Sequence, residues 1–377
     1  MEPPQVDELF EDDAAPSLFT DEIAPERRRG RGAARNPAVR YDRLTTGRTD
    51  DGWDREDDAP PVRTEVIRDA SRSIIARNTS PDLPFDRSVN PYRGCEHGCI
   101  YCFARPSHAQ LGLSPGLDFE TRLVVKPRAA ALLETALRRP GYRPAPLAIG
   151  TNTDAYQPID REHGIMRELL EVLWAYRHPL FITTKGAHLT RDIDLLGRMG
   201  RAGLLQVAIS LTTLDTRLSR AMEPRAAAPP RRLRLMRALA QAGVPVQVNT
   251  SPIIPALNDH EIERLIAAAA EAGASKVSYS VLRLPQEVSG LFQDWLAREY
   301  PDRAARVMGK VRELHGGRDY DPQWGKRMRG EGVYAQLISR RVRAAAARHG
   351  LDRALPALRC DLFRAPPRAG DQLALPL

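Results

Sequence analysis

Three of the four cysteines in this chain fall within eight residues of one another, at Cys95, Cys99 and Cys102. Gly94 and Gly98 lie beside them, and glycine lets a backbone adopt unusual angles and approach an inorganic ion closely. Three thiolates on one loop can hold three corners of a [4Fe–4S] cluster, which normally takes four cysteines. One iron would then stay open to an exogenous ligand, and an open position is typical of a reactive metal site.

The spacing C-x3-C-x2-C, with Tyr101 before the third cysteine, resembles the signature loop of the radical S-adenosylmethionine (SAM) superfamily. The longer run, with Arg93 before the loop and Cys102-Phe-Ala-Arg-Pro106 at its end, resembles the branch related to spore photoproduct lyase, often described as DNA-repair-photolyase-like. The resemblance implies that the three cysteines hold the cluster and that SAM binds the fourth iron. One electron would then cleave SAM to methionine and a 5′-deoxyadenosyl radical.

Other uses of these cysteines are compatible with the residues alone. The three thiolates with His97 or His108 would make a structural zinc site, and a cluster could also be purely structural or carry electrons. A disulfide framework is disfavoured, because four cysteines in 377 residues without a signal peptide indicate a reduced cytoplasmic protein.

Composition adds a weaker indication about partners. The formal net charge is +8 and the pI is about 9.5, with arginine supplying nearly all the positive charge. Arginine suits phosphate, so DNA or RNA is a plausible partner, although a biased genome would give the same composition. No apolar run reaches the roughly 18 residues that span a bilayer, so we expect a cytoplasmic protein with no membrane association.

Short apolar runs alternate with amphipathic stretches after the cysteine loop, which predicts an α/β fold built from βα units around a parallel sheet. With Ser88–Arg93 as the first strand there are six strands, as in the partial (β/α)6 TIM-type barrel that the resemblance implies. The predicted organisation is a disordered acidic-then-arginine-rich arm (1–62), the barrel (63–285), C-terminal helices closing the barrel (286–350) and a C-terminal segment (351–377). The later strands are expected at 146–150, 179–183, 204–209, 244–248 and 275–282, and the C-terminal helices at 291–315 and 327–349.

The carboxyl ends of the predicted strands are polar, and in parallel barrels these ends converge on one mouth. The resemblance places Tyr101 against the SAM adenine and Ser210 and Asn249 near its ribose or carboxylate. Lys185 is expected to hold the SAM carboxylate or a substrate phosphate. The segment expected to meet the SAM amino group comprises Thr151, Asn152, Thr153 and Asp154.

Spore photoproduct lyase uses a further cysteine to return a hydrogen atom to its product, but no cysteine lies between Cys102 and Cys360 here. Tyr156 or Tyr279 could donate the hydrogen, Cys360 could fold back, or the reaction could differ; we favour the last. Reversal of the spore lesion is therefore not predicted.

The chain ends in Gln-Leu-Ala-Leu-Pro-Leu, and Gln372–Leu377 resembles the peptide that docks repair proteins on the bacterial sliding clamp. The leading hypothesis is a radical SAM enzyme for nucleic-acid repair or modification, reduced by a flavodoxin or ferredoxin. The alternatives are a radical SAM enzyme for a peptide or small metabolite, and a non-catalytic DNA-associated scaffold with a structural metal.

Overall fold

The computed structural model describes residues 23, 25–41 and 61–367. Within this part, a seven-stranded sheet has the order β10-β9-β8-β7-β6-β3-β2. The strands from β3 to β10 run parallel, and β2 lies antiparallel to β3 at one edge. The predicted α/β fold with a partial barrel is confirmed. The strands are β2 Ile75–Arg77, β3 Arg87–Val89, β6 Leu147–Ile149, β7 Leu180–Thr184, β8 Leu205–Ser210, β9 Val246–Ile253 and β10 Lys276–Val281.

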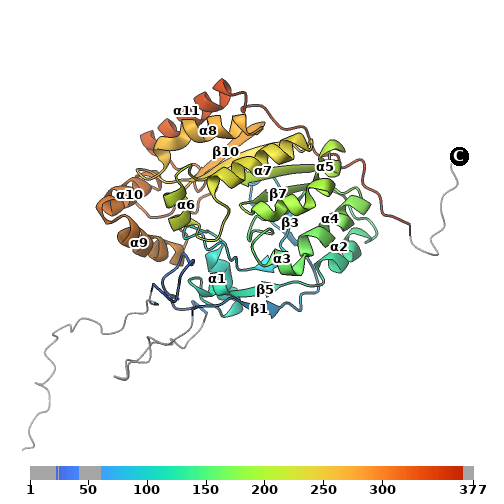
Figure 1. Cartoon of the computed structure of the whole chain (residues 1–377), viewed down its shortest axis with the longest axis horizontal. Coiled ribbons are helices and arrows are strands. Elements are labelled where there is room, and N and C mark those ends of the chain that lie inside the picture. Colours follow the sequence, from blue (N-terminus) through green and yellow to red (C-terminus); the bar gives the residue numbers. More distant parts are fainter. Residues whose placement is uncertain (1–22, 24, 42–60, 368–377) are drawn as a thin grey trace, which may run out of the picture.

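Helices cover the outer face of this sheet (Figure 1), where their apolar stripes pack on alternate strand residues. In α4 the buried side chains recur at helical spacing from Ile165 to Leu173, which is why this segment folds as an amphipathic helix. Each large aliphatic side chain buried in this way contributes about 1.5–3 kcal/mol. The helices between the strands are α2 Ala129–Leu137, α3 Asp160–His163, α4 Ile165–Ala175, α5 Ile193–Arg201, α6 Thr216–Met222, α7 Pro229–Gln241 and α8 Ile262–Glu271, with 3-10 turns η1 Arg105–Leu111, η2 Ala187–Asp192 and η3 Asp259–Glu261.

The predicted first strand divides into two short strands that belong to different sheets. β3 ends at Val89, and β4 (Tyr92–Arg93) pairs antiparallel with β5 (Arg122–Val125), which in turn lies parallel to β1 (Glu65–Arg68). Pro91 lies between β3 and β4, and proline has no N–H to continue a ladder. The chain therefore leaves the barrel sheet just before the cysteines, which are followed by α1 (Asp118–Thr121).

Helices form the C-terminal part, as predicted, but there are three of them where two were expected. The expected helix over 291–315 is interrupted, because α9 (Glu287–Glu299) ends before Pro301 and α10 (Pro301–Leu314) starts there. The last helix, α11 (Gly332–Arg348), begins five residues later than predicted and packs on α8 (Figure 1), where Arg341 pairs with Glu263 at 2.6 Å. No helix in the described part of the chain is long and apolar enough to cross a membrane.

Part of the N-terminal arm differs from the prediction of disorder over 1–62. Residues 25–41 pack against the body of the protein, and Ala33 and Ala34 are almost completely buried. Arg31 donates to the Glu120 carbonyl at 2.8 Å and to Thr64 Oγ1 at 3.0 Å. The arginines here therefore form specific contacts in addition to carrying charge. The acidic residues 1–22 lie outside the described residues.

Candidate active site

The cysteine loop follows β4 and is held tightly by its neighbours. Cys95 and Cys99 are each 7% exposed, and the Cys95 N–H donates to the Phe119 carbonyl at 2.8 Å. Gly94 and Gly98 have φ angles of 76° and 65°. A Cβ on Gly98 would lie 2.7 Å from Glu120 Oε2, and one on Gly94 would lie 2.7 Å from a Leu123 methyl carbon. Both positions therefore require glycine for space as well as for backbone conformation.

The three thiols of the loop are free and close enough to affect one another. Burial, together with the charges of Asp154 and the other two cysteines, raises the pKa of Cys95 well above its usual value. Burial also raises the pKa of Cys99 to about 12, although Lys185 opposes this rise. Ionisation of these thiols therefore requires a strong positive partner, and a coordinated metal provides one.

A buried ion pair holds the loop from one side. Arg105 and Glu120 are both fully buried, with Arg105 Nη2 and Glu120 Oε1 2.5 Å apart. Arg105 also donates to the Cys99 carbonyl at 3.0 Å and the Gly98 carbonyl at 3.3 Å. The Glu120 carboxylate also accepts from the Gly32 N–H, at 2.8 Å, and from the neighbouring Ala33 N–H. The N-terminal segment is thus tied to the loop through one carboxylate.

A second buried ion pair, between Glu223 and Arg232, lies against Tyr101. The Tyr101 hydroxyl donates to Glu223, and Thr212 Oγ1 donates to the same carboxylate at 2.9 Å. Burial alone would raise the pKa of Glu223, but Arg232 and then Lys185 outweigh burial and lower it to about 2. Glu223 is therefore a permanent anion that fixes the Tyr101 side chain.

In the polar segment 151–154, which follows β6, the last two side chains are held by hydrogen bonds within the protein. Asp154 accepts from Thr184 Oγ1 at 2.6 Å and from the Lys185 N–H at 2.7 Å, and His97 lies 3.3 Å away. Burial opposes the charged form, but His97 and these donors lower the pKa of Asp154. Thr153 Oγ1 is likewise occupied by the Tyr92 carbonyl.

These bonds fix Asp154 and Thr153 as positioning residues between the loop and the strand ends. By contrast, the Thr151 and Asn152 side chains form no hydrogen bond with any described residue, so they stay available to a ligand.

Lys185 directly follows β7 and Ser210 ends β8, but Asn249 lies within β9, which runs past the predicted strand end to Ile253. Ser210 is paired in register with Asn249, whose side-chain oxygen accepts from Ser278 at 2.6 Å. The Lys185 ammonium lies 5.8 Å from the centre of the Tyr101 ring and makes no ion pair with any described carboxylate. Burial alone would lower the pKa of Lys185, but Cys99 and Glu223 outweigh it and raise the pKa. The structure therefore brings a lysine with no ion-pair partner among the described residues to the mouth beside the cysteine loop.

Comparison with known proteins identifies the family to which the cysteine loop and the following strands belong. Residues 89–269, from the end of β3 through most of α8, match the model of the radical SAM superfamily. The chain belongs to the radical SAM superfamily. An uncharacterized protein of Mycobacterium tuberculosis is 40% identical over 260 residues, which are 68% of this chain and 75% of the relative. A second uncharacterized relative, from Methanocaldococcus jannaschii, is 24% identical and matches over 66% of this chain and 89% of its own length.

Among solved structures, spore photoproduct lyase complexed with the dinucleoside spore photoproduct has a TM-score of 0.55 and is 16% identical. The match covers 75% of this chain and 79% of the lyase. A tyrosine-to-phenylalanine mutant of spore photoproduct lyase has a TM-score of 0.54 at 17% identity, covering 75% of this chain and 78% of the mutant chain. At 16–17% identity the similarity shows the fold alone. The predicted resemblance to the spore photoproduct lyase branch is therefore confirmed for the fold.

Membership in the radical SAM superfamily implies a [4Fe–4S] cluster and SAM, and the residues of the loop fit this cofactor. A zinc ion needs its ligands to converge at about 2.0–2.3 Å, but the described residues contain no group of three His, Cys, Asp or Glu side chains placed to hold one metal ion. His97 faces Asp154, and His108 Nε2 lies 3.0 Å from the Arg122 carbonyl. A [4Fe–4S] cluster takes one cysteine per iron, so its thiols need not converge on one point.

Cys360 lies at the opposite end of the barrel from the loop. Its pKa is raised by burial and then Asp361, and lowered by Arg87, the first residue of β3. The neighbouring Arg359 N–H donates to the carbonyl of Gly203, which precedes β8. Cys360 is therefore near the amino ends of the strands and cannot close the cluster loop or donate a hydrogen atom at its mouth.

Neither tyrosine suggested as a hydrogen donor points into the mouth. Tyr156 is completely buried, and its hydroxyl donates to Asp192 at 3.1 Å. Tyr279 shares the outer face of β10 with Val277 and packs toward the helices, with the Arg329 guanidinium 4.0 Å from its ring centre. Successive side chains of a strand point to opposite faces. The neighbouring Ser278 faces Asn249, so Tyr279 points to the other face of β10.

Sequence reasoning gave no role to the four charged residues that hold the cysteine loop: Arg105, Glu120, Glu223 and Arg232. Arg105 belongs to the run that carries the family resemblance, and Arg232 carries a signal of its own. Arg232 occupies the apolar stripe of α7, three and four residues before Leu235 and Met236, and all three side chains are buried. A charged residue at a core position of an amphipathic helix requires a buried partner, although the pattern does not reveal which one.

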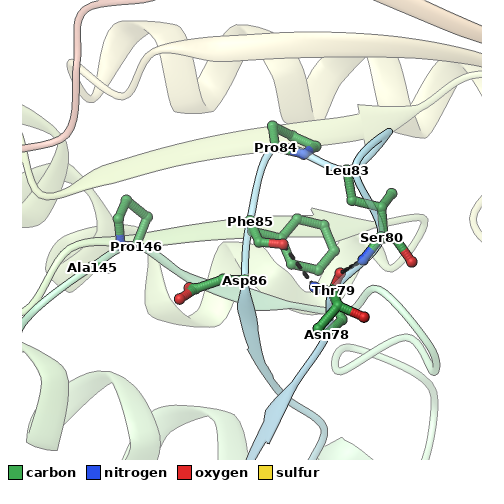
Figure 2. Close-up of a pocket in the computed structure, with 9 residues that line it drawn as sticks. All are labelled: Asn78, Thr79, Ser80, Leu83, Pro84, Phe85, Asp86, Ala145 and Pro146. Atoms are coloured by element: carbon green, nitrogen blue, oxygen red, sulfur yellow. Dashed lines mark hydrogen bonds between the residues drawn. The ribbon is translucent and has the colours of Figure 1, made fainter.

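A pocket of about 480 Å³ lies at the other end of the radical SAM barrel (Figure 2). Its lining includes Asp86 and Pro146, which immediately precede β3 and β6. Asn78 closes the loop beside it, donating to the Phe85 carbonyl at 2.7 Å and accepting from the Ser80 N–H at 3.0 Å. Because active sites of parallel barrels lie at the carboxyl ends of the strands, this pocket is not the active site.

Proposed function

We propose that this protein binds a [4Fe–4S] cluster through Cys95, Cys99 and Cys102 and uses SAM to form a radical in a nucleic-acid substrate, for repair or modification. The observation that carries the proposal is the position of the three free thiols, which follow the first barrel strand and adjoin the polar ends of the next strands. When bound and reduced, the cluster supplies the electron that cleaves SAM to methionine and a 5′-deoxyadenosyl radical.

The chain's own residues would bind and orient SAM at the mouth. Lys185, which has no ion-pair partner among the described residues, would bind the SAM carboxylate or, alternatively, a substrate phosphate. Thr151 and Asn152 offer free oxygen acceptors for its amino group, while Ser210 and Asn249 face the same space for the ribose. The Glu223 network holds Tyr101 rigid against the adenine, because a fixed ring loses less conformational entropy when the ligand binds.

Nucleic acid is the substrate class that the observations support best. The net charge is +8, and a solved structure of the lyase that shares this fold contains the dinucleoside spore photoproduct. Spore-lesion reversal itself is disfavoured, because Cys360 is at the far end of the barrel and no other cysteine follows Cys102 in the sequence.

The test is anaerobic cleavage of SAM by the full chain reconstituted with iron and sulfide. With dithionite as reductant, the wild-type protein should form 5′-deoxyadenosine, and Cys99→Ala should lose both iron and product. A protein that holds a full cluster yet forms no 5′-deoxyadenosine, with or without oligonucleotide, would contradict the proposal and favour the scaffold hypothesis. Radical formation only with a peptide or small metabolite would exclude nucleic acid.

Two partners are part of the proposal. A flavodoxin or ferredoxin should replace dithionite as the electron donor. The terminal peptide Gln372–Leu377 lies outside the described residues, and we infer that it docks on the sliding clamp. Deleting it should abolish association with the clamp in a pull-down, and unchanged association would exclude the docking role.

A further inference from the structure

A second pocket, of about 160 Å³, lies at the rim of the barrel mouth beside the cysteine loop. Its wall includes His97 of that loop, His188 from the turn after β7, and three arginines: Arg161, Arg225 and Arg231. They come from three separate segments of the chain, α3, the loop after α6 and the first turn of α7. We call this pocket the arginine pocket.

Two of the three arginines of the pocket lack a carboxylate partner in the described part of the chain. The pocket lining contains no carboxylate, and the Arg161 and Arg231 side chains form no hydrogen bond or ion pair with any described residue. Arg225 lies 3.5 Å from Glu96, which also accepts from Thr64 at 2.6 Å.

The carboxylates nearest the pocket are already occupied. Asp154 is bonded to Thr184 and the backbone. Asp160 accepts from Tyr92 at 2.6 Å and Arg191 at 2.9 Å. Neither forms an ion pair with an arginine that lines the pocket.

Side chains, and not the backbone, are the donors that this pocket offers. The N–H groups of Ala226 and Ala227 already donate to the carbonyls of Glu223 and Lys185. His188 Nε2 is buried without a hydrogen-bond partner, and its nearest carboxylate oxygen, on Asp160, is 3.9 Å away. The Arg161 and Arg231 guanidinium groups are solvent-exposed, and with the unsatisfied His188 ring nitrogen they line one recess, where an anion with several acceptor oxygens would bind all three.

We propose that the arginine pocket binds a backbone phosphate of the nucleic-acid substrate and sets the position of the strand over the mouth. This inference rests on the proposed function and names the contact by which the substrate is held. Arginine forks match the geometry of phosphate oxygens, and the volume equals that of about five water molecules, enough for one phosphate group. Gly186 of the pocket directly follows Lys185, so a strand bound here would continue across the SAM site.

Fluorescence anisotropy with a short labelled single-stranded DNA tests this assignment in the full-length, cluster-loaded enzyme. Neutralising Arg161→Gln and Arg231→Gln together should weaken binding by about tenfold or more. The slope of log K against log salt should fall by about 0.7, the contribution of one phosphate on a single strand. The matched control is Arg237→Gln, an exposed residue further along α7 with the same change of charge, which should leave affinity and slope unchanged.

Substrate-independent formation of 5′-deoxyadenosine separates this inference from the proposed function, since the double variant should retain it in full. Unchanged DNA affinity in the double variant would overturn the phosphate assignment, as would an equal loss in Arg237→Gln or a mononucleotide that binds as tightly as the oligonucleotide. A loss confined to flavodoxin-driven SAM cleavage, with DNA binding intact, would place an acidic reductant in the pocket and overturn it as well.

Discussion

Replacing Glu120 with glutamine should destabilise the protein by about 3–5 kcal/mol, the usual cost of leaving one buried charge without its partner. Glu120 is fully buried and accepts from Arg105 at 2.5 Å and from the N–H groups of Gly32 and Ala33 at 2.8 and 2.9 Å. Glutamine keeps the shape but loses the charge, so Arg105 becomes an uncompensated buried cation. The amide would also turn its N–H₂ group toward a donor, because every group around this carboxylate donates.

The loss is large compared with the roughly 5–15 kcal/mol that stabilises an average domain. Anaerobic urea unfolding would measure it, and hydrogen exchange would locate it. Because the carboxylate joins the N-terminal segment to the cysteine loop, faster exchange should appear first at residues 31–34 and 95–102. Glu313→Gln is the matched control: the Glu313 side chain is 43% exposed, and Lys310 is its one ion-pair partner among the described residues, so the loss of stability should stay below about 1 kcal/mol.

A Glu120→Gln protein as stable as the Glu313→Gln control would refute the reasoning. So would a loss of protection spread evenly over the barrel, since the damage is expected in the two segments that share this carboxylate.

Three further predictions concern other parts of the chain. Lys185→Gln should weaken SAM binding about 10- to 100-fold by calorimetry, because it removes one charge-assisted hydrogen bond; equal affinity would exclude this contact. The hydrogen bond from Arg327 lowers the pKa of Asp82; burial alone would raise it, and the charge of Arg327 adds to the lowering. This pair therefore stabilises the fold above about pH 4, the ordinary carboxyl pKa, and the stabilisation is lost as pH falls through the lower folded pKa. Arg327→Gln should thus differ from wild type in urea unfolding at pH 7 and converge with it in acid. Cys360→Ser should leave iron content and SAM cleavage unchanged, because Cys360 lies at the far end of the barrel; a fall in iron would make it a ligand.

The barrel strands and their helices could be predicted because each buries a regular set of side chains. β8, for example, lies within one residue of the predicted range, and the buried positions of α4 follow helical spacing. Polar strand ends were predictable for the same reason, since the carboxyl ends of parallel strands must share one edge.

Tyr279 shows that the period of a strand must be applied to each of its residues. Val277, Tyr279 and Val281 alternate with serines along β10, so the same period-two rule that identified the strand assigns the tyrosine to the apolar outer face. A tyrosine can donate a hydrogen atom, which suggested this role for Tyr279. Its position in the alternation of β10 directs the side chain away from the mouth.

The N-terminal segment could not be predicted from local pattern, because nothing in its own sequence stabilises it. Its Gly, Ala and Arg residues have neither apolar period nor strand propensity, as expected for a disordered arm. Its order comes from a partner about 90 residues away, the Glu120 carboxylate, which binds two backbone N–H groups. Nearly any residue type supplies such N–H groups, so they leave no mark in the sequence.

The two buried ion pairs explain why the cysteine loop has one position. Arg105 donates to carbonyls inside the loop while Glu120 binds the N-terminal segment. On the other side, Arg232 donates to the Ser210 carbonyl at 3.1 Å while Glu223 binds Tyr101. A buried pair adds little net stability compared with apolar residues, but removing either partner is expensive. A displaced loop would separate the partners of these pairs, so the pairs hold the loop in one position. A radical enzyme needs a fixed loop because its cofactor and substrate must meet at a fixed distance. Sequence patterns do not reveal these charged residues, because each one stabilises the loop through a contact with a residue distant in the sequence, and such a contact produces no periodic pattern.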